Sequence, residues 1–484
     1  MSSVTFKNPK LAAARQALVT IVGERGILDR AEDLTLYEYD GGVDKHKPEL
    51  VVFPRTPQQV AEICKVVAQH DLTFVGRGAG TGLSGGVIAR CGGLMMSFAR
   101  LNTIENIDLP NERMQVQAGV VNLDVTLAVQ SQGYFYAPDP SSQRACTIGG
   151  NVAENAGGPH TLAYGVTTNH VLGLDVTLPN GHRFSTGGDE LDLPGYDLTG
   201  FITGTEGTMA LVTSAKLRLM RQPELVKTVL AIYNTTKDAA DTVAEITARA
   251  ITPVAVEMLD GEMLRMVEEA THAGYPLDAQ AVLLIEMEGL KEAVEEQVEE
   301  VRKACEACHC REFRIAKDAA ERDLLWKGRK NAFGAVGRMS PFYYVQDGVV
   351  PRTKITETLL EIYRIGEKYG LKISNIFHAG DGNMHPIILF DARVPGQLKA
   401  AQMAGDDILS YCISVGGSIT GEHGVGMEKM ELMTKQFSDD TLDEMKKFKN
   451  LFDPECRLNP GKLLPTGKCC GEIFHKPLEP ANTY

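Results

Sequence analysis

The sequence lacks any apolar run long enough to cross a membrane, although 43% of its 484 residues are hydrophobic. Its first residues, Met1 to Lys7, also lack the basic-then-apolar pattern of a secretory signal. We therefore expect a cytoplasmic location. Attachment to the inner face of a membrane would have to come through partner subunits.

The sequence has fewer basic than acidic residues. The chain has 49 Lys and Arg against 63 Asp and Glu, for a net charge of −14. This balance argues against a general affinity for nucleic acid or for an anionic membrane surface. An anionic substrate would therefore need a local cluster of Arg, Lys, His or a metal ion.

A disulfide framework, internal repeats and low-complexity runs are also missing. The ten cysteines are scattered in a pattern that favours reduced thiols. With 23% charged residues, the composition is that of an ordinary globular protein. The length allows two or three domains, each with a substantial core.

Glycine, by contrast, is concentrated in residues 75–86, where six of the twelve residues of VGRGAGTGLSGG are glycine. Such a segment is disfavoured inside a helix or strand, because glycine loses much backbone entropy there. Its N–H groups can instead surround a phosphate at close range. We interpret it as the diphosphate cradle of a dinucleotide, with FAD as the first candidate. The alternative is a flexible surface loop.

The order of elements around this loop argues against a Rossmann fold. Residues 50–53 and 72–75 have the character of short buried strands, with a helix from Pro57 to about His70 between them. Thr56 is the expected N-cap of that helix, and Gln59 completes a capping box. A Rossmann fingerprint would open a helix directly after the first strand, and residues 87–93 do not continue as one.

The strand and helix patterns continue on both sides of this region. We expect a helix over residues 8–30, strands at 94–98, 103–107 and 113–118, and a helix at 122–132. Two further segments rich in small residues follow, TIGGNVAENAGG at 147–158 and GTEGT at 204–208. They flank a strand at 171–178 and precede one at 209–213. Three such segments within one domain indicate one extended ligand.

The character of the sequence changes after Arg221. Strands at 227–233 and 282–287 alternate with charged helices at 236–250 and 291–305. This pattern predicts an α+β domain with an antiparallel sheet and helices on one face. The tail from Pro465, which includes Cys469 and Cys470, is expected to be a surface arm.

Two histidine-bearing motifs lie in the last part of the chain. The first is HAGDGNMH, with His378 and His385, and the second is Gly421-Glu422-His423-Gly424. Two imidazoles and a carboxylate are a usual ligand set for a divalent metal with open positions. The alternative is a set of ordinary polar loop residues.

Taken together, these motifs resemble the vanillyl-alcohol oxidase/p-cresol methylhydroxylase superfamily of FAD-linked oxidases. The two histidine motifs and Asn459-Pro460-Gly461-Lys462 resemble its 2-hydroxy-acid branch, which includes the FAD subunits of glycolate oxidases and the D-lactate dehydrogenases. The resemblance covers residues 35 to 465. It implies an α+β fold with an N-terminal helical segment (1–34), a PCMH-type FAD-binding domain (35–222), a substrate or cap domain (223–415) and a C-terminal segment that closes the active site (416–484).

The resemblance also implies the reaction and its residues. The enzyme would oxidise a small 2-hydroxy acid, glycolate or D-lactate, to the 2-oxo acid with FAD as acceptor. His378, His385 and Glu422 would hold Zn, Fe or Mn, and His423 would take the hydroxyl proton. Arg329 would bind the substrate carboxylate. The residues implied for FAD binding are Pro54, Arg77, Gly78, Ala79, Gly80, Thr81, Gly82, Ser84, Gly85, Pro138, Asp139, Thr147, Gly149, Gly150, Asn151, Ala153, Asn155, Gly158, Gly165, Glu206, Gly207 and Asn459.

Two details narrow these expectations. Phe333 and Val345 occupy positions that bind a second carboxylate in 2-hydroxyglutarate enzymes, so their apolar side chains favour a monocarboxylate. The first glycine loop has no His or Cys, which predicts noncovalent FAD. Electrons would pass to oxygen, a quinone, an electron-transfer flavoprotein, or a complex with a second flavin subunit and an iron–sulfur subunit.

Three other functions each match part of the sequence. A noncatalytic flavin electron-transfer subunit would lack the full His/Glu set. Cys305 to Cys310 contains the C-x-x-C-H pattern of haem attachment, but no export signal or second cysteine pair accompanies it. Gly82 to Gly86 matches the hydrolase elbow G-x-S-x-G, which needs a helix directly after the serine.

Overall fold

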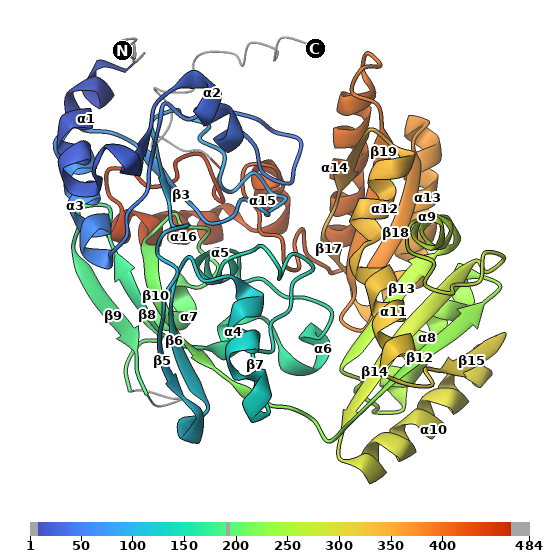
Figure 1. Cartoon of the computed structure of the whole chain (residues 1–484). Helices are drawn as coiled ribbons and strands as arrows, with labels where there is room; N and C mark the ends of the chain where they lie inside the picture. The colour runs from blue at the N-terminus through green and yellow to red at the C-terminus, as the bar shows by residue number, and fades with distance from the viewer. Residues whose placement is uncertain (1–7, 190–193, 466–484) are drawn as a thin grey trace.

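The computed structural model describes residues 8–189 and 194–465, which form two lobes (Figure 1). The predicted surface arm after Pro465, with its two cysteines, lies outside these residues. Residues 1–7, which lack a secretory-signal pattern, also lie outside them. The first lobe holds the strands up to Arg221 and also the C-terminal segment, drawn in red beside the blue and cyan elements. The second lobe holds the strands from Leu225 onward.

A four-stranded sheet carries the glycine-rich loop. Its order is β1 (Ile27–Leu28), β2 (Leu50–Val52), β4 (Leu94–Ser97) and β3 (Phe74–Arg77), with β2, β4 and β3 parallel. Helices α1 (Pro9–Val22) and α3 (Pro57–Gln69) pack on it. The predicted cap is present, since the backbone N–H of Gln59 donates to Thr56 Oγ1 at 3.2 Å.

Two local predictions in this lobe are wrong at their ends. The first helix stops at Val22 rather than near residue 30, because Gly23 adopts φ 74° and the chain turns into β1. Strand β3 continues through Gly76 into Arg77, inside the glycine-rich segment. A Cβ at Gly76 would lie 2.9 Å from Leu211 Cδ2, so glycine lets this strand pack closely on its neighbour.

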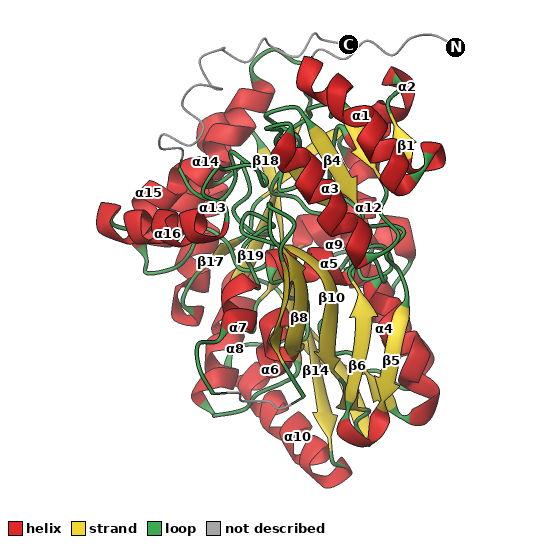
Figure 2. Ribbon diagram, turned by 90° about the vertical axis from the view of Figure 1, so that its left-hand side faces the viewer, coloured by secondary structure: helices red, strands yellow, loops and turns green. Residues whose placement is uncertain are grey.

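A five-stranded antiparallel sheet forms the other half of the first lobe, and Figure 2 shows part of it with the strands side by side. Its order is β5 (Ile104–Asp108), β6 (Arg113–Gln117), β10 (Leu211–Arg218), β8 (Val171–Thr177) and β9 (Arg183–Gly187). The smaller elements of this lobe are α2 (Ala31–Leu34), α4 (Asn122–Val129), β7 (Tyr134–Phe135), α5 (Ile148–Glu154), α6 (Thr161–Tyr164), α7 (Leu198–Ile202) and β11 (Met220–Arg221).

The second lobe is built on an eight-stranded antiparallel sheet. Its order is β15 (Glu312–Ile315), β12 (Leu225–Tyr233), β14 (Ala281–Gly289), β13 (Ala255–Asp260), β18 (Lys372–His378), β19 (Asn383–Phe390) and β16 (Phe342–Val345), with β17 (Gly348–Val349) also pairing with β19.

Helices cover both faces of this sheet, so the prediction of one covered face is wrong. One core contains residues of α8 (Thr236–Ala248), α10 (Lys291–Ala307), α13 (Ile355–Tyr369) and α14 (Gln397–Ser414). The opposite core contains residues of α9 (Gly261–Thr271), α11 (Ala319–Lys330) and α12 (Ala332–Met339). The physical reason is visible in β12, where every residue from Thr228 to Tyr233 is buried, so that both faces need a cover.

The C-terminal segment returns to the first lobe. After α15 (Met433–Gln436) and α16 (Asp439–Phe452), Leu458 forms a parallel bridge with Phe74 at the start of the glycine-bearing strand. The Asn459 side chain then donates to the Gly86 carbonyl at 3.0 Å and to the Glu206 carbonyl at 2.8 Å. The last described residues therefore help to close the glycine-rich region.

No helix within the described ranges has both the length and the apolar character needed to cross a bilayer. The eight cysteines in the same residues are all thiols.

Candidate active site

Two adjoining cavities follow the glycine-rich segments. A smaller one of about 80 Å³ lies inside the first lobe, and a larger one of about 430 Å³ extends from the glycine loop to the second lobe. Of the residues predicted to bind FAD, those that line one or both cavities are Arg77, Gly78, Ala79, Gly80, Thr81, Gly82, Thr147, Gly149, Gly150, Asn151, Ala153, Glu206 and Gly207.

Glycine residues, which have no side chain, allow the backbone around these cavities to pack closely. A Cβ at Gly78 would lie 2.4 Å from Thr147 Oγ1, and Gly80 adopts φ 73°, a conformation that favours glycine. Thr147 also begins helix α5 as its N-cap. The two glycine segments thus meet at Gly78 and Thr147, and this close approach suits a cradle for a phosphate-bearing dinucleotide.

The remaining predicted FAD residues do not line either cavity. Several have structural roles nearby: the Pro138 carbonyl accepts from Asn122, Asp139 pairs with His160 and Lys330, and Asn155 ends α5 in the left-handed region. The full set that lies away from the cavity walls is Pro54, Ser84, Gly85, Pro138, Asp139, Asn155, Gly158, Gly165 and Asn459.

The larger cavity brings together the five residues expected to carry the chemistry. Arg329, His378, His385, Glu422 and His423 all line it. His378 ends β18 and His385 lies in β19; the register pairs His385 with Ile376, two residues before His378, so the two imidazoles share one face of the sheet. Their ring centroids are 5.0 Å apart.

Glu422 supplies a carboxylate between the two imidazoles. Its Oε1 lies 3.0 Å from His378 Nε2 and 3.3 Å from His385 Nε2. One ligand atom from each of these three residues lies within 4.8 Å of the others, an arrangement that fits a single divalent metal ion.

The other nitrogens of the two imidazoles are also bound. His378 Nδ1 lies 2.7 Å from Glu257 Oε1, and His385 Nδ1 lies 3.3 Å from the Gln346 carbonyl oxygen. Such partners fix the ring orientation of metal-binding histidines. Burial alone would lower the pKa of His378, but the charges of Glu257 and Glu422 raise it well above its ordinary value.

Arg329 lies beside this cluster and not on the surface. Its side chain is 2% exposed, its Nε donates to Glu257 Oε2 at 2.5 Å, and its Nη2 is 3.4 Å from His378 Nδ1. Glu257 therefore joins the guanidinium to the His378 imidazole. The next residue, Lys330, also lines the cavity and pairs with Asp139 Oδ2 at 3.4 Å.

An aromatic pair forms the apolar wall. Phe333 and Tyr343 both line the larger cavity, and their rings stack with centroids 6.5 Å apart. Val345, the second apolar position singled out in the sequence, is buried in the core on the α9 side of the sheet and does not line the cavity. Tyr343 lies two residues from Val345 in β16 and therefore on the same face of the sheet, but of the two only Tyr343 reaches the cavity wall.

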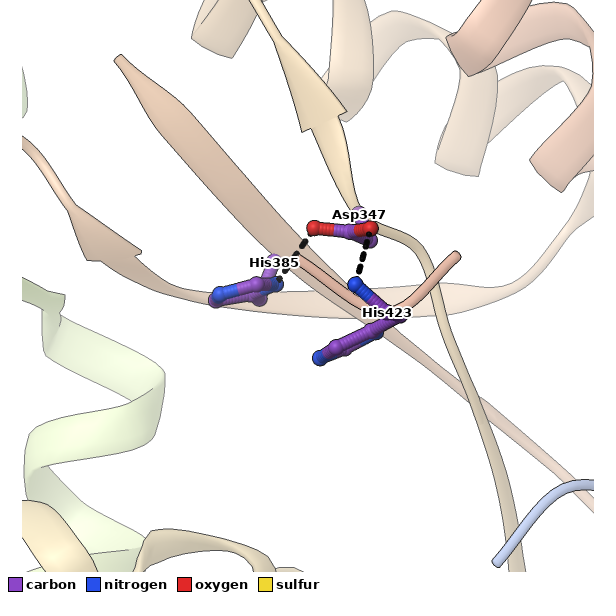
Figure 3. Close-up of side chains that lie close together, drawn as sticks. All are labelled: Asp347, His385 and His423. Carbon is purple, nitrogen blue, oxygen red and sulfur yellow. Dashed lines mark hydrogen bonds and ion pairs between the residues drawn. The ribbon is translucent and has the colours of Figure 1, made fainter. Parts of the chain in front are cut away.

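Sequence reasoning overlooked three acids at the site: Asp40, Glu154 and Asp347. Asp40 and Glu154 line the larger cavity, and Glu154 lines the smaller one as well. Glu154 was visible as the one charged residue among the small ones of the second glycine segment. Asp347 lies between His385 and His423 in Figure 3, and its only sequence signal was its place just after strand β16.

The cysteine cluster at the end of α10 does not form a comparable site. Two sets of side chains in the described part of the chain are close enough to share a metal ion, and neither includes a cysteine. Cys305 is buried in the core of the second lobe, where it packs as an apolar residue.

The fold and the site define an FAD-dependent oxidoreductase. Residues 48–187 match the FAD binding domain family, and residues 222–463 match the C-terminal domain of FAD linked oxidases. The chain belongs to the FAD-linked oxidase family.

Individual relatives agree with this assignment. The chain is 44% identical over 448 residues to glycolate oxidase subunit GlcD of Escherichia coli K12, with 92% of this chain and 90% of that protein covered. It is 32% identical over 420 residues to a D-lactate dehydrogenase of Archaeoglobus fulgidus, covering 86% and 91%. The crystal structure of p-cresol methylhydroxylase with substrate bound superposes with a TM-score of 0.77 at 18% identity, covering 95% and 97%, and confirms the predicted α+β fold class.

Proposed function

We propose that this protein oxidises glycolate or D-lactate to the corresponding 2-oxo acid, with FAD as the first electron acceptor. The observation that carries the proposal is a single cavity that joins the glycine-lined cradle to two histidines, a glutamate and a third histidine. The names of the two relatives, a glycolate oxidase subunit and a D-lactate dehydrogenase, support the same substrate class.

FAD would occupy the two cavities along the three glycine-rich segments. Noncovalent binding is part of the proposal, since no His or Cys lies in residues 75–86. When bound, the cofactor supplies a flavin N5 that can accept the hydride from the substrate Cα.

A divalent metal, Zn, Fe or Mn, would be held by His378, His385 and Glu422. Contacts with His378 and His385 hold the pKa of Glu422 well below its ordinary value, against the effect of its burial, so that its carboxylate is ionised. A metal ion bound here would lower the pKa of a substrate hydroxyl. His378 and His385 would be kept in place by Glu257 and the Gln346 carbonyl.

His423 would accept the hydroxyl proton. Burial lowers its pKa to about 4 despite the nearby charge of Asp347, so the imidazole is neutral and able to take a proton at neutral pH. Its ring stacks on that of His385 with the ring centroids 4.9 Å apart, which places the base beside the proposed metal ligands.

Arg329 would bind the substrate carboxylate. A planar guanidinium suits a carboxylate, and this one is buried at the wall of the cavity beside His378. The apolar pair of Phe333 and Tyr343 would face the remainder of the substrate. These two rings offer no positive charge to a second carboxylate, which favours glycolate or D-lactate over a dicarboxylate.

The first test is the visible spectrum of the purified protein under anaerobic conditions, followed by separate additions of glycolate and D-lactate. A flavin spectrum that bleaches with either acid supports the cofactor, the reaction and the substrate together. A flavin spectrum that neither acid bleaches, even after Zn²⁺, Mn²⁺ or Fe²⁺ is supplied, would overturn the substrate assignment. The absence of a flavin band after FAD is added back would overturn the proposal as a whole.

The competing assignment is a noncatalytic flavin subunit of an electron-transfer complex. The presence of the complete His/Glu set favours the catalytic assignment. Electrons would leave the reduced flavin to a second flavin subunit and an iron–sulfur subunit, or to an electron-transfer flavoprotein. We propose a cytoplasmic protein that reaches the inner face of the membrane only through such partners.

A further inference from the structure

Residues 421–428, called here the Glu422 turn, pass between the two lobes and carry both Glu422 and His423. Their backbone N–H groups are bound in succession by fixed acceptors. The first three, from Gly421 to His423, donate to the Asp347 carboxylate of the second lobe. The acceptors for the later N–H groups, at Val425 to Glu428, belong to the first lobe: the Glu206 carboxylate and the Ser84 carbonyl.

Asp347 is the centre of the contacts at the start of this turn. Its side chain is fully buried, and its Oδ2 receives the His423 N–H at 2.9 Å and the Gly421 N–H at 3.1 Å. The Thr420 hydroxyl donates to the same oxygen at 2.5 Å, and the Glu422 N–H lies 3.3 Å from both oxygens. Consecutive N–H groups aimed at one carboxylate form an anion-binding nest, which fixes the backbone that supplies them.

The surrounding charges show why Asp347 is not itself a metal ligand. Asp347, His385 and His423 form a second set close enough to share an ion, and this set has His385 in common with the first. The Lys429 ammonium, however, lies 3.2 Å from Asp347 Oδ2, and His385 Nδ1 lies 3.9 Å from Oδ1. A buried ammonium and four other donors already neutralise and occupy this carboxylate, so a cation there would compete with them.

We infer that Asp347 is a positioning residue, which fixes the Glu422 turn so that the Glu422 carboxylate and the His423 imidazole point into the cavity together. Figure 3 shows the arrangement: one contact from Asp347 reaches the His423 main chain and the other reaches the His385 ring. The inference rests on the proposed function, because it assigns Asp347 a role toward the proposed metal ligand and base. It names a residue from a third segment of the second lobe, 75 residues from Glu422 in sequence.

The rest of the Glu422 turn has its own supports. Val425 and Gly426 donate to the two oxygens of Glu206 at 2.7 Å each. Because these contacts do not depend on Asp347, loss of the Asp347 charge is expected to loosen the first three residues of the turn and to leave its second half in place. A variant at Asp347 should therefore fold and keep FAD.

The test uses Asp347→Asn in the full-length protein loaded with FAD. Zn²⁺ affinity is measured by isothermal titration calorimetry, and flavin reduction by glycolate or D-lactate is followed by anaerobic stopped flow. The flavin spectrum and FAD content report on folding. Asp260→Asn is the matched control, since Asp260 is equally buried in the same lobe and accepts from Met263 and Asn375 away from the site.

A second pair of variants separates positioning from charge balance. Lys429→Met removes the ammonium but leaves the three N–H groups of the turn on Asp347. The double variant D347N/K429M removes both charges at once. If Asp347 mattered only as a partner for Lys429, the double variant would recover the Zn²⁺ affinity of the wild type.

We expect D347N to bind Zn²⁺ about 10–100-fold more weakly, the range found when a group that orients a metal ligand is lost. The limiting rate of flavin reduction should fall by more than the apparent substrate affinity, with FAD content unchanged, and D347N/K429M should remain impaired. Wild-type Zn²⁺ affinity in D347N, full recovery in the double variant, or an equal loss in D260N would each overturn the inference. A wild-type protein that binds neither FAD nor Zn²⁺ would instead overturn the proposed function.

Discussion

The imidazole rings of His385 and His423 stack with their centroids 4.9 Å apart and their planes inclined by 13°. His385 belongs to strand β19 and His423 to the Glu422 turn, so the contact joins two segments that approach the cavity from different directions. The stack fixes the plane of the His423 ring relative to the proposed metal ligands. A base held in this way needs no reorientation when the substrate hydroxyl arrives.

Replacement of His423 by Ala should abolish substrate reduction of the flavin. The rate constant for anaerobic flavin bleaching should fall by about 10²–10⁴, the usual contribution of a general base. FAD content and Zn²⁺ affinity should remain close to those of the wild type, because His423 is neither a proposed FAD-binding residue nor one of the three proposed metal ligands. Bleaching at the wild-type rate in H423A would assign the base to another residue.

Removal of the metal should separate chemistry from cofactor binding. Dialysis against a chelator should leave the flavin spectrum intact and suppress bleaching by glycolate or D-lactate, and Zn²⁺, Mn²⁺ or Fe²⁺ should restore it. His378→Ala should make this loss permanent, because His378 Nε2 lies 3.0 Å from the shared Glu422 oxygen.

His170→Ala serves as the control for the metal experiment. His170 is equally buried but contacts the Tyr164 carbonyl in the first lobe, away from the cavity. It should change thermal stability without changing metal content. Full turnover in a chelated protein shown to be free of metal would count against the ligand assignment.

Replacement of Gly78 by Ala should weaken FAD binding. The new methyl group would lie 2.4 Å from Thr147 Oγ1, so the two glycine-rich segments would have to separate. A loss of at least about tenfold in FAD affinity is expected, which is about 1.4 kcal/mol. The measurement is a fluorescence titration of the apoprotein with FAD. Gly337→Ala in α12 is the control, because a Cβ there meets no atom within 4 Å; equal FAD affinity in G78A and G337A would refute the cradle.

Replacement of Phe333 by Ala should widen the range of substrates. Removal of one ring from the pair with Tyr343 would leave room for a longer substituent at Cα. Flavin reduction by 2-hydroxybutyrate relative to glycolate should rise about tenfold in kcat/KM, the usual effect of one methylene in an apolar pocket. Phe342→Ala is the control, since Phe342 is 41% exposed and stacks on Phe390; an unchanged ratio in F333A would contradict the assigned wall.

The His160 side chain predicts a stability that depends on pH. It contacts Asp139 at 3.0 Å in its own lobe and Glu286 at 3.3 Å in the other. Burial alone would lower its pKa, but these two carboxylates raise it from the ordinary value of 6.5 to about 10. Lys330, Arg322 and Glu288 lie in the same charged cluster.

Because the folded-state pKa is raised, the stabilisation is fully present below pH 6.5 and is lost as the pH rises toward 10. His160→Gln should therefore destabilise the protein by about 3 kcal/mol near pH 6 and flatten the decline of its denaturation midpoint between these limits. His182→Gln is the control, because His182 is exposed. This variant should neither destabilise the protein nor change the pH dependence of its denaturation midpoint. A parallel pH dependence in H160Q and the wild type would contradict this role.

Sequence patterns located the capped helix α3 and the glycine loop, because each of these elements is specified by a few adjacent residues. Asp347 could not be found in this way, because its partner at His423 lies 76 residues away and the intervening chain gives no spacing rule. The second covered face of the large sheet was missed for a related reason: β12 is apolar on both sides, and only the packing shows which helices cover each side.

The contact of Asn459 with the carbonyl groups of Gly86 and Glu206 has a consequence for the biosynthesis of this protein. The glycine loop and the third glycine segment are translated early, but the residue that joins them emerges only after more than 450 residues have been made. A nascent chain still attached to the ribosome thus lacks one support of its cofactor site. FAD loading should accordingly follow the synthesis of Asn459, and a nascent first lobe without it would be more exposed to misfolding.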